Sequence, residues 1–429
     1  MSEPRYEYLV IGNSTAAIAA VEALRRTDPR GSLAVVSREA QPAYCAPLIT
    51  YVLAGKVPEE RIGYRPADFY EKLRVETFLG RAATAIDAAA HTVTLEDGTE
   101  LGYGKLLLAC GGDPILPPLP GVDLEGVFTF TRYADLERVR DYLGSRQVQQ
   151  AVVIGGGMIG VKTAEALAKL ELNTTVVELL PRILSQALNE TGSAAAQRAL
   201  EEAGVTILTS RPAAALEGKK GAVTGVRLEN GQVLPAQIVI LAIGVRPSLE
   251  LAETAGLKTS RGVLVDERMR TSDPDIYAAG DVTEGHDMLL GETRPVAIWP
   301  SAYLQGEVAG TNMAGGKATH DGSVAMNSIQ ICGLPTISVG LIDPQRAEEV
   351  LEYTSQDGKN YRCIFLRGGK IIGAIFVGEI DRAGIITGLI REGVNVSDFK
   401  EKLISRELGL LSLPREYRRY KVEGPGIEV

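Results

Sequence analysis

The stretch AVVIGGGMIGVKTAEALAKL, residues 151–170, decides the fold. It joins an apolar run, typical of a buried strand, to an alanine-rich helical pattern through Gly155, Gly157 and Gly160, which are spaced as G-x-G-x-x-G. The first glycine permits a tight turn, the second lets the backbone approach a pyrophosphate, and the third lets helix and strand pack closely. The exposed amides at the helix start then meet the negative charge of the phosphates. The stretch therefore predicts a strand, turn and helix that bind a dinucleotide.

The segment after this helix indicates which dinucleotide is bound. A second strand pattern, TTVVE, ends in Glu178. A carboxylate at this point accepts hydrogen bonds from an adenosine ribose and repels a 2′-phosphate, so it favours NAD(H) over NADP(H). The alternative is a tight strand-to-helix turn that binds nothing.

The N-terminal stretch VIGNSTAAIAAVEAL, residues 10–24, repeats the pattern with two departures. Gly12 supplies the turn, while Ser14 and Ala17 stand where the second and third glycines would be. Both are small enough for close approach. The strand pattern LAVVS follows, and Glu39 lies just beyond it, where a carboxylate could hold a ribose. Alone this loop is ambiguous, but as the first of a pair it predicts a second nucleotide site.

Three further stretches complete the pattern. TSDPDIYAAGD, residues 271–281, places Gly280 and Asp281 after a short strand, where a carboxylate can bind a polyol such as a ribityl chain. KLLLACGGDPILPPLPG, residues 105–121, is an apolar strand followed by glycines and prolines, which is typical of a crossing between domains. A related strand, IVILAIGVRP, closes the middle region at residues 238–247.

Composition restricts the classes of protein that fit. The 429 residues suffice for two or three domains, and 45 Lys and Arg against 54 Asp and Glu give a net charge of −9, which argues against nucleic acid as the main partner. We see no secretory signal and no apolar run long enough for a membrane span. The four cysteines are scattered without a C-x-x-C, so we expect a reduced, cytoplasmic protein without a metal site of its own. The basic cluster REYRRYK, residues 415–421, is typical of a solvated surface and less often docks an acidic partner.

The ordered motifs GNSTAA, LACGGDP, GGGMIG, AIGVRP and AAGD resemble the two-dinucleotide-binding-domain flavoproteins of the pyridine nucleotide–disulfide oxidoreductase superfamily. Within it, the chain is similar to NADH–rubredoxin reductases, NADH oxidases and coenzyme A-disulfide reductases. The resemblance implies an α/β fold with two Rossmann-like, three-layer domains, the NAD domain being inserted in the FAD domain, and a small C-terminal α+β interface domain. We therefore expect a discontinuous FAD-binding domain at 1–116 and 244–322, an NAD-binding domain at 117–243, and the interface domain at 323–429.

The resemblance also implies two cofactors, FAD and NAD(H), and the residues that bind them. Those expected at FAD are Gly12, Ser14, Ala17, Glu39, Cys110, Gly111, Gly280, Asp281, Trp299 and Ala302. Those expected at NAD are Gly155, Gly157, Gly160, Glu178 and Gly244. The helix that starts at AIWP resembles the family helix whose N-terminus points at the flavin and stabilises negative charge on its reduced form, with Ser301 as a further candidate.

Two departures from the family pattern leave the electron acceptor open, and both residues are candidate catalytic groups. Disulfide-reducing members carry a redox cysteine about where Pro47 falls, whereas Cys45 lies two residues earlier and is either an activated thiolate or a small buried thiol. Lys162 stands where many relatives have a glutamate that touches the nicotinamide. It could block that site, pair with Glu165 or Glu178, or point to solvent. In this departure the chain resembles flavin subunits that partner iron–sulfur proteins, such as the flavin subunit of phenylglyoxylate dehydrogenase, and the resemblance implies that this chain could be such a subunit.

The C-terminal part of the chain carries patterns of its own. Residues 330–340 and 362–376 alternate and are apolar enough for sheet strands, and a helical pattern covers 381–391. Together they predict a small α+β domain, with contact to a partner or another subunit as its functional interpretation.

The leading interpretation is an FAD-dependent NADH:acceptor oxidoreductase, in which a hydride passes between nicotinamide C4 and flavin N5. A ferredoxin-like or other iron–sulfur protein would exchange the electrons, alone or as a subunit of a larger complex, because the chain has no redox cysteine pair. One alternative changes the acceptor to coenzyme A disulfide, persulfide or dioxygen, acting through Cys45. Another is a non-catalytic sensor or scaffold that binds FAD and NADH. A homodimer is compatible with each of these.

Overall fold

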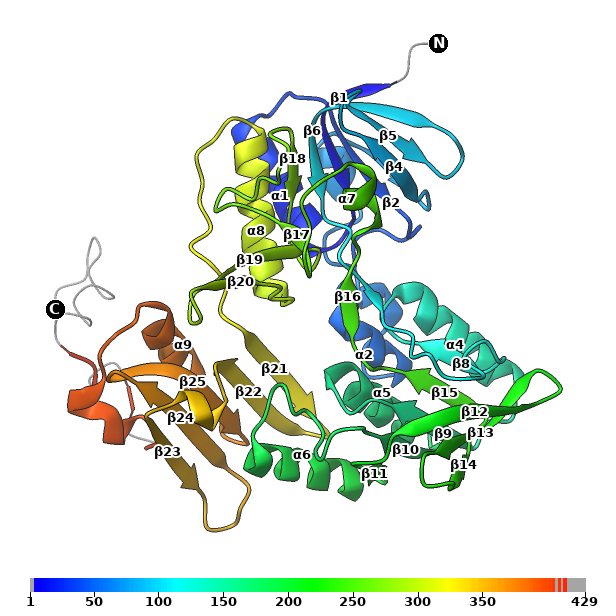
Figure 1. Cartoon of the computed structure of the whole chain (residues 1–429), viewed down its shortest axis with the longest axis vertical. Coiled ribbons are helices and arrows are strands. Elements are labelled where there is room, and N and C mark those ends of the chain that lie inside the picture. The colour runs from blue at the N-terminus through cyan, green and yellow to red at the C-terminus, as the bar shows by residue number, and fades with distance from the viewer. Residues whose placement is uncertain (1–3, 406–407, 410–411, 415–429) are drawn as a thin grey trace. The chain divides into compact units, whose positions relative to one another are not determined.

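The computed structural model describes residues 4–405, 408–409 and 412–414, so the basic cluster at 415–421 lies outside the described residues. Within those ranges, no helix is both long and apolar enough to cross a membrane. The chain divides into two compact units, whose elements are labelled in Figure 1. They are residues 1–179 with 204–323, and residues 180–203 with 324–429.

A seven-stranded sheet in the first unit combines the N-terminal strands with one strand from much later in the chain. In order across the sheet, the strands are β3 (Val75–Leu79), β2 (Leu33–Ser37), β1 (Arg5–Ile11), β6 (Glu100–Leu108), β5 (Thr92–Leu95) and β4 (Ala83–Asp87), with β18 (Ile276–Ala278) paired to the end of β6. Strands β3, β2, β1, β6 and β18 are parallel, whereas β4 and β5 form an antiparallel extension. Strand β2 coincides with the predicted LAVVS strand and is buried throughout.

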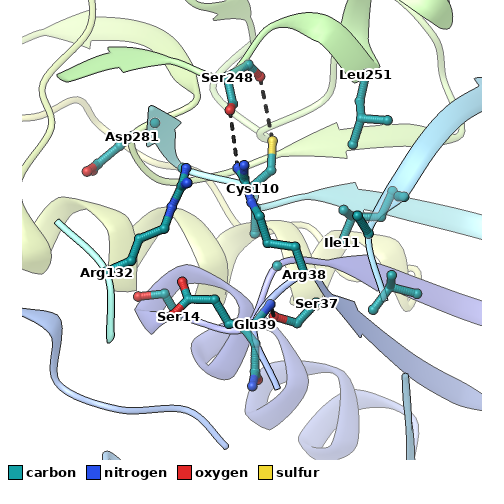
Figure 2. A pocket seen from close by; sticks show the side chains of 18 of the residues that line it. Ile11, Ser14, Ser37, Arg38, Glu39, Cys110, Arg132, Ser248, Leu251 and Asp281 are labelled. Atoms are coloured by element: carbon teal, nitrogen blue, oxygen red, sulfur yellow. Dashed lines mark hydrogen bonds between the residues drawn. The ribbon is translucent and has the colours of Figure 1, made fainter. Parts of the chain in front are cut away.

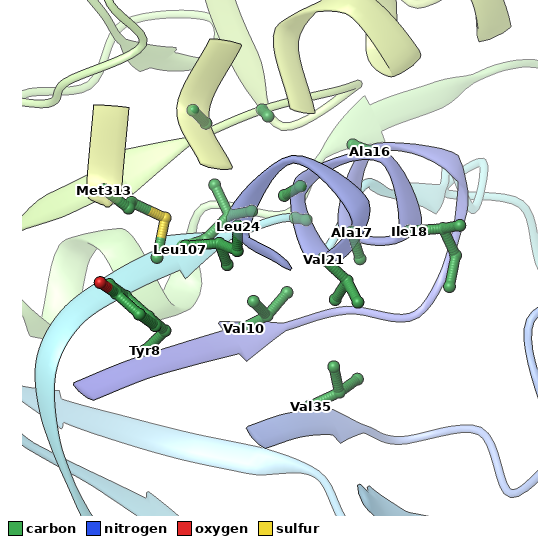
Figure 3. Packing of buried hydrophobic residues seen from close by; sticks show 14 of the residues in the cluster. Tyr8, Val10, Ala16, Ala17, Ile18, Val21, Leu24, Val35, Leu107 and Met313 are labelled. Atoms are coloured by element: carbon green, nitrogen blue, oxygen red, sulfur yellow. The ribbon is translucent and has the colours of Figure 1, made fainter. Parts of the chain in front are cut away.

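Helices cover both faces of this sheet and make it the middle of three layers. Helices α1 (Thr15–Thr27) and α8 (Trp299–Met313) lie side by side on one face. Their buried cluster, drawn in Figure 3, includes Val10, Ala16, Ala17, Val21, Leu24, Val35, Leu107 and Met313. On the other face, core residues of the strands pack with α7 (Glu250–Thr254).

Two glycines of α8 allow it to approach α1 closely. A Cβ atom at Gly306 would lie 2.1 Å from the carbonyl oxygen of Ala16, and one at Gly310 would lie 2.3 Å from that of Ala20. Both distances are far inside van der Waals contact, so any larger residue would push the helices apart. This packing fixes the start of α1, which is the predicted nucleotide loop.

A five-stranded parallel sheet forms the other half of the first unit. In order, its strands are β11 (Thr206–Leu208), β10 (Asn173–Val177), β9 (Gln150–Ile154), β15 (Ile238–Leu241) and β8 (Val127–Thr129). Helix α5 (Met158–Lys169) packs on β9, β10 and β15, and α4 (Tyr133–Ser145) packs beside β8. A small antiparallel sheet consists of β12 (Ala213–Lys219), β13 (Ala222–Leu228) and β14 (Val233–Pro235). This small sheet packs against the five-stranded sheet through a shared apolar cluster.

Two adjacent crossings connect these sheets. Strand β7 (Gly112–Pro114) leaves the first sheet after β6, and β16 (Val245–Pro247) returns after β15; the two strands pair antiparallel. The five-stranded sheet is thus inserted between β6 and β18 of the first sheet, which confirms the predicted α/β class with one domain nested in another. Shorter elements complete the unit: η1 (Ala46–Leu48), α2 (Ile49–Leu53), η2 (Glu59–Arg61), α3 (Phe69–Lys72), β17 (Val263–Leu264), β19 (Thr283–Asp287) and β20 (Glu292–Arg294).

The second unit is an antiparallel sheet with helices. Its strands are, in order, β21 (Met326–Ile331), β22 (Leu334–Gly340), β25 (Lys370–Val377), β24 (Tyr361–Arg367) and β23 (Glu349–Thr354). Helix α9 (Ala383–Arg391) packs on β22 and β25, and α6 (Glu190–Glu202) on β21 and β25. The short helices η3 (Pro344–Arg346) and η4 (Ser397–Lys402) complete it. Each of the two predicted strand patterns, 330–340 and 362–376, contains a turn between two strands, because residues with positive φ at Gly333 and Gly369 reverse the chain.

The contact between α1 and α8 gives the first prediction. Gly306→Ala should lower the free energy of unfolding by about 1–3 kcal/mol, because the added methyl group meets the backbone of α1. The matched control is Gly144→Ala in α4, where a Cβ atom meets nothing within 4 Å and alanine favours the helix. Denaturant unfolding of both FAD-loaded variants measures the difference. Equal stability of the two variants would contradict the packing.

Candidate functional site

A cavity of about 520 Å³ opens at the carboxyl ends of β1, β2 and β6. Ligands of open parallel sheets bind at this edge, where neighbouring connections run to opposite faces. The cavity brings together six of the residues predicted for FAD, most of which Figure 2 shows from close by: Gly12, Ser14, Glu39, Cys110, Gly111 and Asp281.

The loop after β1 forms one wall of this cavity. Gly12 has φ +121°, and a Cβ atom there would lie 2.1 Å from the carbonyl oxygen of Ala109. Ser14 is the N-cap of α1 but its side chain makes no capping hydrogen bond, so the first amides of the helix are available to an anion. Ala17 lies deeper, in the buried cluster, and supports the loop from below.

A charged network that borders the same cavity was not predicted from the sequence. Arg38 and Arg132 both pair with one carboxylate oxygen of Asp113, at 3.1 Å for Arg38. The hydroxyl of Ser248 donates to the other oxygen. Burial alone would raise the pKa of Asp113, but the Ser248 hydroxyl and the two guanidiniums outweigh it and hold that pKa below its ordinary value. Two cations therefore share one carboxylate at the cavity, which suits a ligand with phosphate groups.

Two carboxylates that line the cavity, those of Glu39 and Asp281, differ in whether a protein group hydrogen-bonds them. Glu39 accepts a hydrogen bond of 2.7 Å from the hydroxyl of Tyr44, which holds it at the end of β2. Among the described residues, none hydrogen-bonds the carboxylate of Asp281, and burial raises the pKa of this group. Asp281 is half-buried, and a carboxylate that is partly removed from water without a protein partner is costly, so its oxygens are available to a hydroxylated ligand.

The other residues predicted for FAD lie outside the lining of the cavity. Gly280 donates its backbone N–H to Gln305, at 2.8 Å, in the segment that leads to Asp281. Trp299 packs edge-on against Tyr64, with ring centroids 5.2 Å apart, and Ala302 is buried in the cluster under α8. These residues place the start of α8 through packing.

The predicted NAD loop repeats the geometry of the first one. Gly155 has φ +112°, and its Cβ atom would lie 2.3 Å from the carbonyl oxygen of Ala242. Gly157 is the N-cap of α5 and has open space beside it, while a Cβ atom at Gly160 would meet the carbonyl oxygen of Gly155. Glu178 follows β10 and accepts a hydrogen bond from the backbone N–H of the loop. The carboxylate of Glu178 and the start of α5 thus lie at the same loop.

Exposed apolar side chains surround this loop. The exposed side chains are Met158, Leu179, Ile243 and Val245, which are 39%, 66%, 40% and 42% exposed. Gly244, which has φ +128°, lies between the last two of them, just after β15. Large exposed apolar side chains that flank a nucleotide loop are expected where a ligand covers them.

The two candidate catalytic residues, Cys45 and Lys162, lie next to α2. The backbone of Cys45 caps the three-residue helix η1, and burial raises the pKa of its thiol, which outweighs the opposite effect of the Leu48 amide. This favours the neutral thiol and works against an activated thiolate. Lys162 pairs with Glu165, one of the partners considered from the sequence.

Comparison with known proteins identifies the class of protein. The family model of pyridine nucleotide-disulphide oxidoreductases matches residues 6–306, and that of the rubredoxin NAD+ reductase C-terminal domain matches residues 326–394. The first match covers more than half of the chain, so the chain belongs to the pyridine nucleotide-disulphide oxidoreductase family. Members of this family are oxidoreductases that use FAD and NAD(H), which confirms the predicted cofactors.

Particular relatives extend this result to most of the chain. The chain is 31% identical to the epsilon subunit of NADH-dependent phenylglyoxylate dehydrogenase from Aromatoleum evansii, over 94% of this chain and 96% of the relative. It is 30% identical to the ferredoxin–NAD(+) reductase component of the biphenyl dioxygenase system of Paraburkholderia xenovorans, over 90% and 94%. The solved covalent complex of putidaredoxin reductase with putidaredoxin matches with a TM-score of 0.83 and 26% identity, over 92% and 94%. Two further relatives are longer, and the chain spans about half of their length.

The described residues fit FAD in the cavity. The helix start at Ser14 and the paired guanidiniums suit its pyrophosphate, and the unpartnered Asp281 suits its ribityl hydroxyls. The turn at Gly12 leaves the backbone open to close approach. Arg38 could have been found in the sequence, because it directly follows the β2 strand beside Glu39.

The raised pKa of Cys45 gives the second prediction. We expect its thiol to react with iodoacetamide more slowly at neutral pH than an unfolded cysteine, since less thiolate is present. The rate should still be rising above pH 9.0, the ordinary pKa of a thiol, because the folded pKa lies higher. Alkylation of the FAD-loaded protein followed by peptide mass spectrometry measures the rate, with the urea-unfolded chain as control. A labelling midpoint below the ordinary value would indicate an activated thiolate instead.

Proposed function

We propose that the chain is an FAD-dependent oxidoreductase that passes electrons between NAD(H) and an iron–sulfur electron carrier protein. The observation that carries this proposal is the pair of equivalent turns at Gly12 and Gly155, each ending a central strand and opening a helix in one compact unit. In this proposal the loop at Gly12 holds FAD and the loop at Gly155 holds NAD(H). FAD, when bound, accepts two electrons as a hydride and releases them singly.

The residues of the chain contribute binding, alignment and charge. The cations Arg38 and Arg132 and the start of α1 hold the pyrophosphate of FAD, and Asp281 holds its ribityl chain. The loop that starts at Gly155 holds the pyrophosphate of NAD(H), and Glu178 holds the adenosine ribose. Each NADH oxidised yields NAD+, one proton and two electrons, so two one-electron carriers are reduced.

The chemistry of the partner is inferred from two kinds of support. Burial raises the pKa of three of the four cysteines, Cys45, Cys110 and Cys363, which leaves no activated thiol pair for a disulfide substrate among the described residues. The names of the relatives refer to a ferredoxin reductase, a putidaredoxin complex and a subunit of a larger dehydrogenase. An iron–sulfur carrier, free or as another subunit, is therefore the acceptor we propose.

The predicted domain boundaries belong to this proposal. We assign FAD binding to residues 1–116 and 244–322, NAD binding to 117–243, and partner or subunit contact to 323–429. A homodimer is compatible with the same assignment, as is location in the cytoplasm.

Electron transfer to an iron–sulfur protein gives the third prediction. In anaerobic stopped-flow, NADH should bleach the flavin absorbance, and a [2Fe–2S] ferredoxin should restore it. Cys45→Ser should change the ferredoxin rate by less than about twofold, because the thiol takes no part. Restoration by coenzyme A disulfide alone, and its loss in Cys45→Ser, would contradict the proposal in favour of a thiol route. Flavin that is bleached but not reoxidised by any acceptor would indicate the sensor class.

Selection of the dinucleotide gives the fourth prediction. Glu178→Ala should raise kcat/KM for NADPH relative to NADH by roughly tenfold, because the carboxylate no longer repels a 2′-phosphate. The matched control is Glu229→Ala, which removes the same charge from an exposed position after β13. Steady-state assays with both dinucleotides measure the ratio. A wild-type protein that uses both equally well would refute the role of Glu178.

A further inference from the structure

A cluster of three charged side chains connects α5 to the segment that contains α2. The Nζ atom of Lys162 lies 2.5 Å from one carboxylate oxygen of Glu165, and the Nζ atom of Lys56 lies 2.5 Å from the other. Lys162 also lies over the ring of Tyr51, 4.4 Å from its centroid. The side chains of Lys162 and Glu165 are only 11% and 8% exposed. Together the two lysines and the carboxylate carry one positive charge, mostly shielded from solvent.

The position of this cluster relates it to both proposed nucleotide sites. Helix α5 starts at the nucleotide loop, and Lys162 lies in its second turn. Helix α2, which contributes Tyr51, directly follows η1, and Ala46 of η1 lines the FAD cavity. Helices α2 and α5 are in contact. In the proposed function, a dinucleotide held at the loop extends toward the cavity, so its nicotinamide end is expected on the side of α5 and α2 where Lys162 lies.

The two forms of the dinucleotide differ in charge at that end alone. The nicotinamide ring of NAD+ is positively charged, whereas that of NADH is neutral, and the phosphates and adenosine are the same in both. A nearby cation therefore weakens NAD+ binding and leaves NADH binding nearly unchanged. The effect is larger at a site that is partly buried, because water and salt screen it less.

We propose that Lys162 sets the preference of this chain for the redox state of its dinucleotide, so that NADH binds more tightly than NAD+. The inference rests on the proposed function, in which NAD(H) binds at the loop that starts at Gly155. Its consequence is that NAD+ leaves readily after hydride transfer and inhibits NADH oxidation less. Lys162 is thus a specificity-determining residue, with Glu165 and Tyr51 as the groups that position its ammonium.

A purely structural role makes a different prediction. If Lys162 served only to hold α5 against α2, its loss would weaken both forms of the dinucleotide by the same factor. The ratio of the two dissociation constants therefore separates the two roles, whereas turnover does not.

The experiment measures that ratio on the oxidised, FAD-loaded full-length protein. The ligands are NAD+ and 1,4,5,6-tetrahydro-NAD, whose ring is neutral and cannot deliver a hydride, and calorimetry gives each Kd. We expect wild type to bind the neutral analogue more tightly, and Lys162→Gln to lower the ratio of Kd for NAD+ to Kd for the analogue by about tenfold, which is about 1.4 kcal/mol. Lys162→Arg, which keeps the charge, should keep the ratio.

Two further variants make the test decisive. Lys169→Gln removes the same charge from an exposed position in the last turn of the same helix, and it should leave the ratio unchanged. Lys162→Met, whose stem can still pack on Tyr51, replaces Lys162→Gln should that variant not fold. A ratio that stays within twofold of wild type in the uncharged variants would overturn the inference and leave the proposed function standing. If wild type bound neither NAD+ nor the neutral analogue, both the inference and the proposed function would be overturned.

Discussion

The structure depends on two turns that leave no room for a side chain. At Gly12 and at Gly155, a Cβ atom would lie 2.1 Å and 2.3 Å from the carbonyl oxygen of the residue that directly follows the neighbouring strand. Because each turn is this tight, the helix that follows starts directly over the carboxyl edge of its sheet, with its free amides pointing where a phosphate can lie. The close packing of α1 on α8 holds the first of these helix starts in place. The charged groups of both sites are arranged around these two points.

These charges serve recognition more than stability. Partly exposed ion pairs such as Arg38 with Asp113 add little to the free energy of folding, and buried ones barely repay their desolvation. Their value lies in fixing the direction of each guanidinium before a ligand arrives. Asp281 is another group whose value lies in recognition, since a half-buried carboxylate with no described protein partner costs stability unless a ligand hydrogen-bonds it. Stability comes instead from the apolar layers on each sheet.

The sequence allowed prediction of features that depend on neighbouring residues. Each nucleotide turn, its flanking strand and its helix lie within about twenty residues, so their pattern is visible in one stretch. The network of Arg38, Asp113, Arg132 and Ser248 joins four distant segments, and only the crossing of β7 and β16 brings them together. Strand β23 was missed because most of its residues are exposed and give no apolar pattern. The burial of Cys45, which decides its pKa, likewise depends on tertiary contacts.

In the proposed function, opposite charges act on the two ends of one dinucleotide. Glu178 lies where the adenosine ribose binds, and its repulsion of a 2′-phosphate does not depend on the redox state of the nicotinamide ring. Lys162 lies toward the nicotinamide, and the charge of that ring does not depend on the 2′-phosphate. The two contacts are therefore independent, and two residues on either side of one nucleotide loop can select both the kind of dinucleotide and its redox state. Such selection suits a partner that removes electrons singly, because NAD+ that stays bound can take the hydride back before the partner arrives.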